Sequence, residues 1–268
     1  MISVADGTAS ERFDDVAAEE PLEIRIPQNG KRDHSLAVTM RTPGNDFELV
    51  AGFLFSEGLV ASRDQIASLT YCVDKDVEEE QRFNIVNASI PQMAADLERL
   101  ERHFTMSSAC GVCGKAQLDA LEVRGINPVQ SEMRVSKETI LALPEQLLDS
   151  QRIFAKTGGL HAAALYDAAG HLQALREDVG RHNAMDKLAG WALLEERMPL
   201  GDCIALVSGR SSFEIVQKAA VARIPILCAV SAPSSLAVAL AQRFNITLIG
   251  FLRPGRFNIY AGSQRILL

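Results

Sequence analysis

DCIALVSGRSSFEIVQKAAVARIPILCAVSAPSSLAVALAQRFNITLIGFL, residues 202–252, alternates three short apolar runs with two helix-prone segments. Continuous apolar runs of this length, bounded by turn residues, are typical of strands that are buried on both faces. Strands joined by short helices pair in parallel, and the helices cover the faces of the sheet. This stretch therefore predicts an α/β fold.

The residues before it fall into regions of different character. PLEIRI (21–26) and HSLAVTMR (34–41) alternate apolar and polar residues around an Asn29-Gly30 turn, which predicts a β-hairpin. Residues 45–58 have the apolar spacing of a helix, and IASLTYCV and RFNIVNASI indicate a second strand pair. We expect a mobile N-terminal tail over residues 1–20, a β-rich module over 21–104 and an α/β domain over 105–268.

Within the expected α/β domain, the pattern predicts helices at about 114–123, 136–155 and 181–198. Residues 157–178 contain two apolar stretches around the turn-like DAAG, which predicts two strands.

Composition narrows the class of protein. The chain has 268 residues, of which 47% are hydrophobic and 23% charged, and no apolar run reaches the roughly 18 residues of a membrane span. The start, MISVADGTASERFDD, has no basic segment followed by an apolar one, so we expect a cytoplasmic protein without a secretory signal. The formal net charge of -7 argues against general nucleic-acid binding, because phosphate contacts require a basic surface.

A pair of thiols is the first candidate for chemistry. SSACGVCGKA, residues 107–116, contains Cys110 and Cys113 with two residues between them. The KAQLDAL that follows is helix-prone, so the thiols are expected where free N–H groups lower a thiol pKa from about 8.5. Cys110 is then expected to be the more accessible nucleophile. Three further cysteines lie in apolar strand patterns and are interpreted as inert buried thiols: Cys72, Cys203 and Cys228.

Other chemistries also use such a pair. A structural zinc site needs four N or S ligands, and no second pair with suitable spacing is present. A thioredoxin-like redox motif belongs in the first βα unit of its fold, whereas this pair follows a long β-rich region. A zinc nucleobase deaminase has P-C-x-x-C after H-x-E, but Ala109 precedes Cys110 here and no H-x-E comes earlier. From the residues alone, metal binding, redox exchange and sulfur transfer stay open.

Two loops follow the ends of predicted parallel strands. VSGRSSFE (207–214) and VSAPSSLAV (230–238) each lead from a strand into a helix, where outward N–H groups suit phosphate. Either loop alone is compatible with helix capping. Both meet at the carboxyl edge of the sheet, however, and together they favour a diphosphate-bearing ligand. The candidates are Ser208, Gly209, Arg210, Ser211 and Ser231.

A charged helix start and a final turn extend this set. REDVGRHNAMDK (176–187) concentrates more polar groups than helix capping requires, and it contributes Asp178, Arg181 and His182. His161 follows TGG; alone, such a histidine is more often a core residue, but it is included as a candidate. GFLRPGRFNIY (250–260) places two arginines around a Pro-Gly turn, where they can bind phosphate or stack on a base. Its candidates are Arg253 and Arg256.

Five motifs occur in a fixed order along the chain: CGVCGKA, TGGLHAAAL, REDVGRHNAMDKLAG, SGRSSFEIVQKAA and FLRPGRFNIY. Together they resemble the formate dehydrogenase accessory sulfurtransferase family, FdhD, over nearly the whole chain from about residue 20. The resemblance implies a cytidine-deaminase-like mixed sheet flanked by helices, with a smaller β-rich N-terminal module and without deaminase chemistry.

The resemblance also implies a function. Members of this family take persulfide sulfur from a cysteine desulfurase and pass it to the molybdenum or tungsten bis-guanine-dinucleotide cofactor, which is then inserted into the formate dehydrogenase catalytic subunit. By position, the persulfide cysteines correspond to Cys110 and Cys113, and the cofactor-binding segment corresponds to Phe251–Arg256.

Further expectations follow from the same resemblance. The bound substrate would be molybdenum bis(molybdopterin guanine dinucleotide), with GDP-like nucleotides as ligands, and the protein itself would hold no metal. The two nucleotide arms of the cofactor suit a homodimer with one arm per subunit. The alternative is a zinc-binding or non-enzymatic cofactor-chaperone protein that uses the two cysteines as metal ligands.

Overall fold

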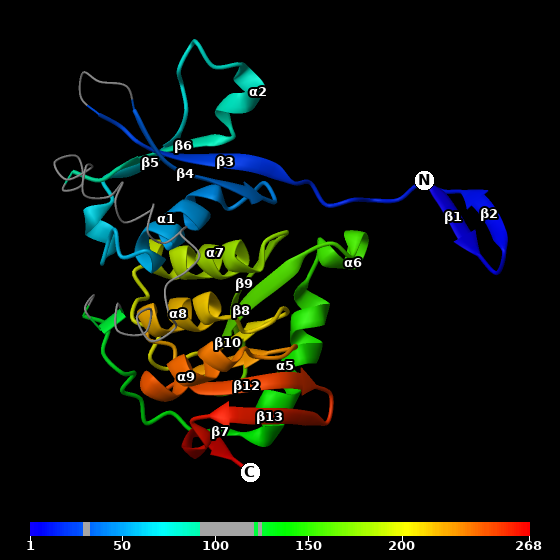
Figure 1. Ribbon diagram of the computed structural model, residues 1–268, viewed down its shortest axis with the longest axis vertical. Helices are drawn as coiled ribbons and strands as arrows, with labels where there is room; N and C mark the ends of the chain where they lie inside the picture. The colour runs from blue at the N-terminus through cyan, green and yellow to red at the C-terminus, as the bar shows by residue number, and fades with distance from the viewer. Residues whose placement is uncertain (29–32, 92–120, 123–124) are drawn as a thin grey trace.

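The computed structural model describes residues 1–28, 33–91, 121–122 and 125–268. Its centre is a six-stranded sheet in the order β13-β12-β11-β10-β8-β9 (Figure 1). The strands are β8 (His161–Tyr166), β9 (Leu172–Asp178), β10 (Ile204–Val207), β11 (Ile226–Ala229), β12 (Thr247–Arg253) and β13 (Arg256–Ala261). β10, β11 and β12 are parallel, whereas β8, β9 and β13 run antiparallel to their neighbours. The predicted parallel strands and the expected mixed α/β sheet are confirmed.

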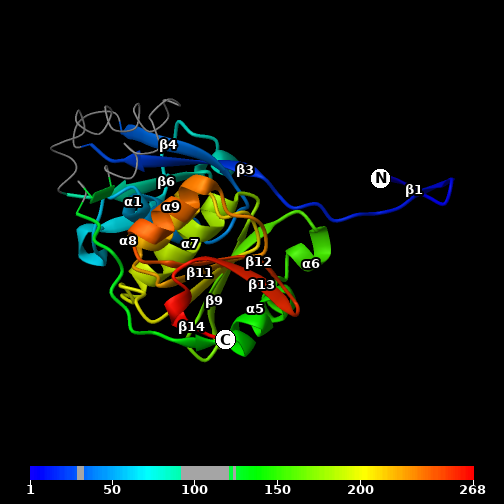
Figure 2. The same ribbon diagram turned by 60° about the horizontal axis from the view of Figure 1, so that its bottom comes forward.

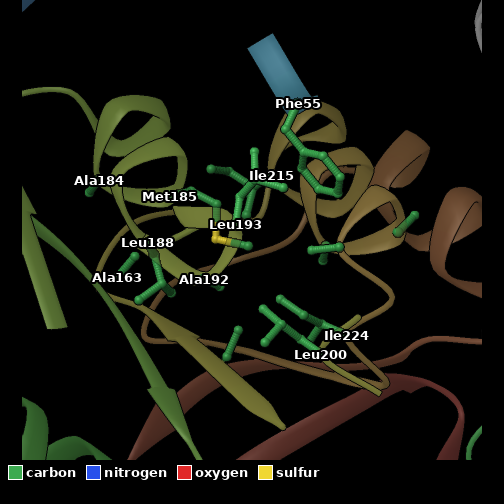
Figure 3. Packing of buried hydrophobic residues seen from close by; sticks show 14 of the residues in the cluster. Phe55, Ala163, Ala184, Met185, Leu188, Ala192, Leu193, Leu200, Ile215 and Ile224 are labelled. Atoms are coloured by element: carbon green, nitrogen blue, oxygen red, sulfur yellow. The ribbon is translucent and has the colours of Figure 1, made fainter. Parts of the chain in front are cut away.

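Helices cover both faces of this sheet (Figure 2). They are α7 (Arg181–Leu194), α8 (Phe213–Val221) and α9 (Ser235–Arg243) on one face and α5 (Lys137–Ser150) on the other. Successive strand residues point to opposite faces, so Val207 of β10 joins one hydrophobic cluster and its neighbour Leu206 joins the second. Figure 3 shows part of the first cluster, where α7 and α8 pack side chains against each other.

A second sheet, in the order β4-β3-β6-β5, is built from the N-terminal part of the chain. Its elements are β3 (Glu20–Ile26), β4 (His34–Arg41), β5 (Ser68–Tyr71) and β6 (Ile85–Ser89), with α1 (Asp46–Ser56), η1 (Arg63–Gln65) and α2 (Glu79–Arg82) between them. The predicted hairpin, helix and second strand pair are confirmed. α1 packs against α7, so this sheet and the central sheet share one hydrophobic cluster (Figure 1).

The remaining elements are short. They are β1 (Ile2–Ala5), β2 (Thr8–Glu11), β7 (Val135–Ser136), α6 (Phe154–Thr157), η2 (Ser263–Arg265) and β14 (Ile266–Leu267). β1 and β2 form a hairpin within the expected N-terminal tail, and Figure 1 shows it apart from the two sheets. The boundary expected near residue 105 lies outside the described residues and stays a prediction. Within the described ranges, no helix is both long and apolar enough to cross a membrane.

Two helices end earlier than the sequence pattern predicts. α7 ends at Leu194 rather than near 198, and Glu196 lies in the left-handed region at φ 55°. The helix expected over 136–155 ends at Ser150, and the chain turns before α6 begins. This turn brings α6 to the carboxyl edge of the central sheet, beside the candidate site (Figure 1).

Candidate functional site

A cavity of about 830 Å³ opens at the edge of the central sheet where β10, β11 and β12 end. Its volume is within the roughly 300–1,000 Å³ that small-molecule and cofactor sites occupy. Five of the predicted ligand residues line it: His161, Ser208, Leu252, Arg253 and Pro254. The opposite wall comes from α5, α6 and the turn between them.

His161 lies at this edge because β8 runs antiparallel to β10, so that β8 begins where β10 ends. Ala162 N–H donates to Ser208 Oγ at 2.9 Å, and the same oxygen lies 3.4 Å from Nδ1 of His161. Burial, and then the positive charge of Arg181, lower the pKa of His161 below its usual value. His161 is therefore a neutral imidazole at neutral pH, oriented by a serine that is itself held by the backbone.

The two strand-end loops are tied to each other and to β12. Ser234 N–H donates to the carbonyl of Ser211 at 3.0 Å, and Phe251 N–H donates to the carbonyl of Ser231 at 3.1 Å. Ser211 is 1% exposed, and its Oγ has no hydrogen-bond partner among the described residues. Ser234 caps α9 by accepting from Ala237 N–H. The loops thus form one connected rim, with Ser211 beneath its surface.

The segment Phe251–Arg256 forms the end of β12 and its turn into β13. Phe251 has φ 52°, and the strand pairing shifts register between Gly250 and Arg253. This bulge turns Leu252 inward, where it is buried, and leaves Arg253 exposed at the cavity wall. Gly255 makes the turn at φ 78°. Arg256, Phe251 and Gly255 are exposed and do not line the cavity.

Asp178, predicted to bind the ligand, is instead buried beside the cavity edge at 0% exposure. Its carboxylate pairs with Nζ of Lys187 at 2.7 Å and accepts from the N–H groups of Thr42 and Gly180 at 3.1 and 2.8 Å. Because Thr42 follows β4, this pair connects the N-terminal sheet to β9. Asp178 supports the edge of the sheet and does not line the cavity.

The two predicted arginines near these loops differ in environment. Arg210 is exposed. Arg181 packs against Gly209, where a Cβ would come within 3.4 Å of its side chain, and its Nε is buried without a partner in the described part of the chain. Gly209 thus leaves room for Arg181 beside His161.

His182 lies at a different, smaller cavity of about 310 Å³. Its Nε2 is 3.3 Å from Ser212 Oγ and 3.8 Å from the carboxylate of Glu214. The cavity is also lined by Asp186 and Lys218, which are paired at 2.7 Å. Burial, and then Arg181, lower the pKa of His182. The structure therefore places five predicted residues at the large cavity and His182 at the smaller one, whereas the other described candidates line neither of these two cavities.

The sequence of this chain is similar to those of known proteins. A model of the FdhD/NarQ family matches residues 17–267. The chain belongs to the FdhD/NarQ family. A relative from Streptomyces coelicolor, named sulfur carrier protein FdhD, is 49% identical over 271 residues, covering 100% of this chain and 94% of its own. A relative of the same name from Sulfurisphaera tokodaii is 44% identical over 267 residues, covering 100% and 97%.

A solved structure extends this likeness to the fold. The crystal structure described as a formate dehydrogenase accessory protein from Desulfotalea psychrophila has a TM-score of 0.74 at 25% sequence identity, covering 100% of this chain and 97% of that chain. The family resemblance drawn from the five motifs is therefore confirmed, and the fold of this FdhD/NarQ member matches a solved relative.

Three of the five cysteines of this FdhD/NarQ member lie within the described residues. Cys110 and Cys113 lie outside the described residues. Burial raises the pKa of Cys72 and of Cys228, and burial with Asp202 raises the pKa of Cys203 to about 12. The three described thiols are thus protonated at neutral pH, in agreement with their interpretation as inert. The strand pattern predicts that Cys203 is buried, but it is only half-buried, because it lies just before β10. No group of three or more His, Cys, Asp or Glu side chains in the described ranges is arranged to hold a metal ion.

The helix-side wall of the large cavity of this FdhD/NarQ member contains residues that the sequence did not predict to be part of the site. Glu145, Leu148, Gln151 and Phe154 come from α5, the following turn and α6. None belongs to a motif with a recognised chemical role. The one local signal is a helix pattern interrupted by SQRIF just before TGG.

Proposed function

We propose that this protein is a sulfur carrier that accepts persulfide sulfur from a cysteine desulfurase and transfers it to the molybdenum or tungsten bis-guanine-dinucleotide cofactor of a formate dehydrogenase. Membership of the FdhD/NarQ family supports this role, as do the relatives named sulfur carrier protein FdhD. The observation that carries the proposal is the cavity of about 830 Å³ at the carboxyl edge of the sheet, with Arg253 at its wall.

Cys110 is the proposed sulfur acceptor. Its thiolate attacks the outer sulfur of the desulfurase persulfide, the S–S bond of the donor breaks, and the desulfurase cysteine leaves as a thiolate. Cys110 then holds the transferred sulfur as a persulfide. Attack of the Cys113 thiolate on the outer sulfur would pass this sulfur to Cys113 and release the thiolate of Cys110. The raised pKa values of the three described thiols support this assignment, because a protonated thiol is a poor nucleophile.

The large cavity is the proposed site of one nucleotide arm of the cofactor. Arg253 would neutralise a diphosphate at the strand ends, where the rim loops also supply polar groups. When Ser208 donates to Nδ1 of His161, the proton of the neutral ring is on Nε2, which becomes a donor for a phosphate or sugar oxygen. These groups allow an acidic protein to bind an anionic ligand locally.

Mass spectrometry of the intact protein tests the sulfur-carrier role. After incubation with a cysteine desulfurase and cysteine, the parent protein is expected to gain the mass of one sulfur atom. Cys110→Ala is expected to lose this gain, and Cys203→Ala, which removes a half-buried thiol of raised pKa, is expected to keep it. A gain that survives the double variant Cys110→Ala/Cys113→Ala would contradict the proposal. Stoichiometric zinc without any gain would favour the metal-binding alternative.

A homodimer with one nucleotide arm per subunit is part of the same proposal, because a cofactor with two identical arms matches a two-fold axis. Light scattering of the full chain with and without GDP checks it. The mass of a single chain in the presence of nucleotide would contradict the dimer.

A further inference from the structure

Gln151 is a buried polar side chain in the wall of the large cavity. It is 4% exposed, and its Nε2 has no hydrogen-bond partner within the described residues. A buried amide donor without an acceptor destabilises a folded protein, because the group has lost its bonds to water and gained none. Because Gln151 lines the cavity, a bound ligand with an acceptor atom could supply the bond that this donor lacks.

The backbone around Gln151 is fixed independently of any ligand. Its carbonyl accepts from Ala155 N–H at 3.1 Å. The next turn is held by Glu177, whose carboxylate accepts from the N–H groups of Ile153 and Phe154 at 3.0 and 2.8 Å. Because Glu177 belongs to β9, the corner between α5 and α6 is tied to the central sheet. The backbone position of Gln151 is therefore set without a ligand, and its side chain lies in the cavity wall.

The two sides of the cavity differ in charge. Of the described residues that line it, Arg253 on the strand side is the one arginine or lysine, and Glu145 on the helix side is the one carboxylate. A phosphate group is attracted to the first and repelled by the second. The base of a nucleotide then lies on the helix side, which Leu148 and Phe154 make apolar.

We propose that Gln151 recognises the base of the bound nucleotide. In this arrangement a 6-oxopurine base packs against Phe154, and Nε2 of Gln151 donates a hydrogen bond to its O6 carbonyl. The inference rests on the proposed function, since it requires a purine nucleotide in this cavity. The unpaired group is a donor, so it matches the oxygen at position 6 and not the amino group that adenine has there. A site built to hydrogen-bond a ligand group discriminates strongly against analogues that leave the site unpaired.

Calorimetry with GDP, IDP and ADP on the full chain tests this specificity. The parent is expected to bind GDP and IDP about tenfold or more tightly than ADP, because one hydrogen bond of about 1.4 kcal/mol separates them. IDP is diagnostic because it keeps O6 and lacks the 2-amino group of guanine. In Gln151→Met, which keeps the length of the side chain without its donor, this preference is expected to disappear through weaker binding of GDP and IDP.

Two comparisons separate this role from a structural one. Gln146→Met, on α5 but outside the cavity lining, is expected to keep the preference of the parent. Without ligand, Gln151→Met is expected to unfold at a temperature equal to or above that of the parent, because it removes an unpaired buried donor. A structural glutamine would instead lower this temperature. Gln151→Leu supplies the same comparison should the first variant not fold.

The outcomes distinguish the inference from the proposed function. Binding of GDP by the parent without preference over ADP would overturn the inference, as would a preference that persists in Gln151→Met. In both cases the nucleotide site itself would stand. Failure of the parent to bind GDP at all would overturn the proposed nucleotide site, and the role of Gln151 with it.

Discussion

Gly52 and Gly190 meet backbone to backbone where α1 crosses α7. A Cβ on Gly190 would lie 1.8 Å from the carbonyl oxygen of Glu48, and a Cβ on Gly52 would lie 1.8 Å from that of Asp186. No side chain fits these distances without a shift of a whole helix. The crossing therefore joins the N-terminal sheet to the helix that begins at the ligand edge (Figure 1).

Gly190→Ala is expected to destabilise the protein by about 3 kcal/mol or more, because its methyl group overlaps a backbone oxygen rather than a movable side chain. Urea unfolding measures the change. Gly201→Ala is the matched control, since a Cβ there meets no described atom within 4 Å. Equal unfolding free energies for Gly190→Ala and Gly201→Ala would contradict the prediction, because they would mean that α1 and α7 can move apart without cost.

Lys187→Met is expected to cost about 3–5 kcal/mol of unfolding free energy, because it leaves Asp178 charged and buried without its partner. The more solvent-accessible pair of Arg243 and Glu122 provides the comparison, and Arg243→Ala is expected to cost about 1 kcal/mol or less. Chemical denaturation at pH 7 measures both. A cost for Lys187→Met no larger than that for Arg243→Ala would contradict this account of the pair.

Arg181→Gln is expected to raise the pKa of both His161 and His182, because Arg181 lowers both values after the larger effect of burial. Burial, the largest cause of both shifts, still lowers both pKa values in the variant. Proton NMR titration of the ring protons measures the shifts. Arg210→Gln removes the same charge from an exposed neighbour and is expected to have a smaller effect. An unchanged pKa for both histidines in Arg181→Gln would contradict the prediction.

The same lowered pKa values determine how stability depends on pH. The folded protein binds protons at His161 and His182 less readily than the unfolded chain does. Their contribution to stability is therefore fully present above the unfolded pKa of about 6.5 and is lost as the pH falls below it. Urea unfolding between pH 7 and pH 5 is expected to show a weaker decline in Arg181→Gln than in the parent.

Arg253→Ala is expected to weaken GDP binding by about tenfold or more, because a charge-assisted bond to phosphate contributes about 1.5–3 kcal/mol. Arg256→Ala is expected to have the smaller effect, since Arg256 is exposed outside the cavity lining. Neither variant should change the uptake of sulfur from the desulfurase. Calorimetry that finds the larger loss in Arg256→Ala would move the phosphate site to the outer side of the turn.

The sequence predicts the parallel strands and the N-terminal hairpins well, because continuous or alternating apolar residues report directly on burial. The sequence does not predict that β8 runs antiparallel to β10. Strand direction depends on this pairing, and it produces no pattern in the sequence of β8 itself. His161 therefore resembles a core histidine in the sequence, although it lies at a ligand edge.

Side-chain environment is harder still to predict. Asp178 resembles a ligand residue because its neighbours are charged, yet its partner Lys187 is on the next element and both are buried. The sequence does not single out Gln151, because its proposed role depends on a side-chain donor that lacks a partner within the described residues. A missing partner can be recognised only in a packed structure.

The β8–β9 hairpin places His161 opposite Asp178 at its open end, and its turn, residues 167–171, is at the other end of the strands. Six residues of extended chain separate the two ends by about 20 Å. Ala168 and Ala169 are exposed in that turn. A short epitope or a fluorescent label inserted between them would report on partner encounters while leaving the ligand edge untouched.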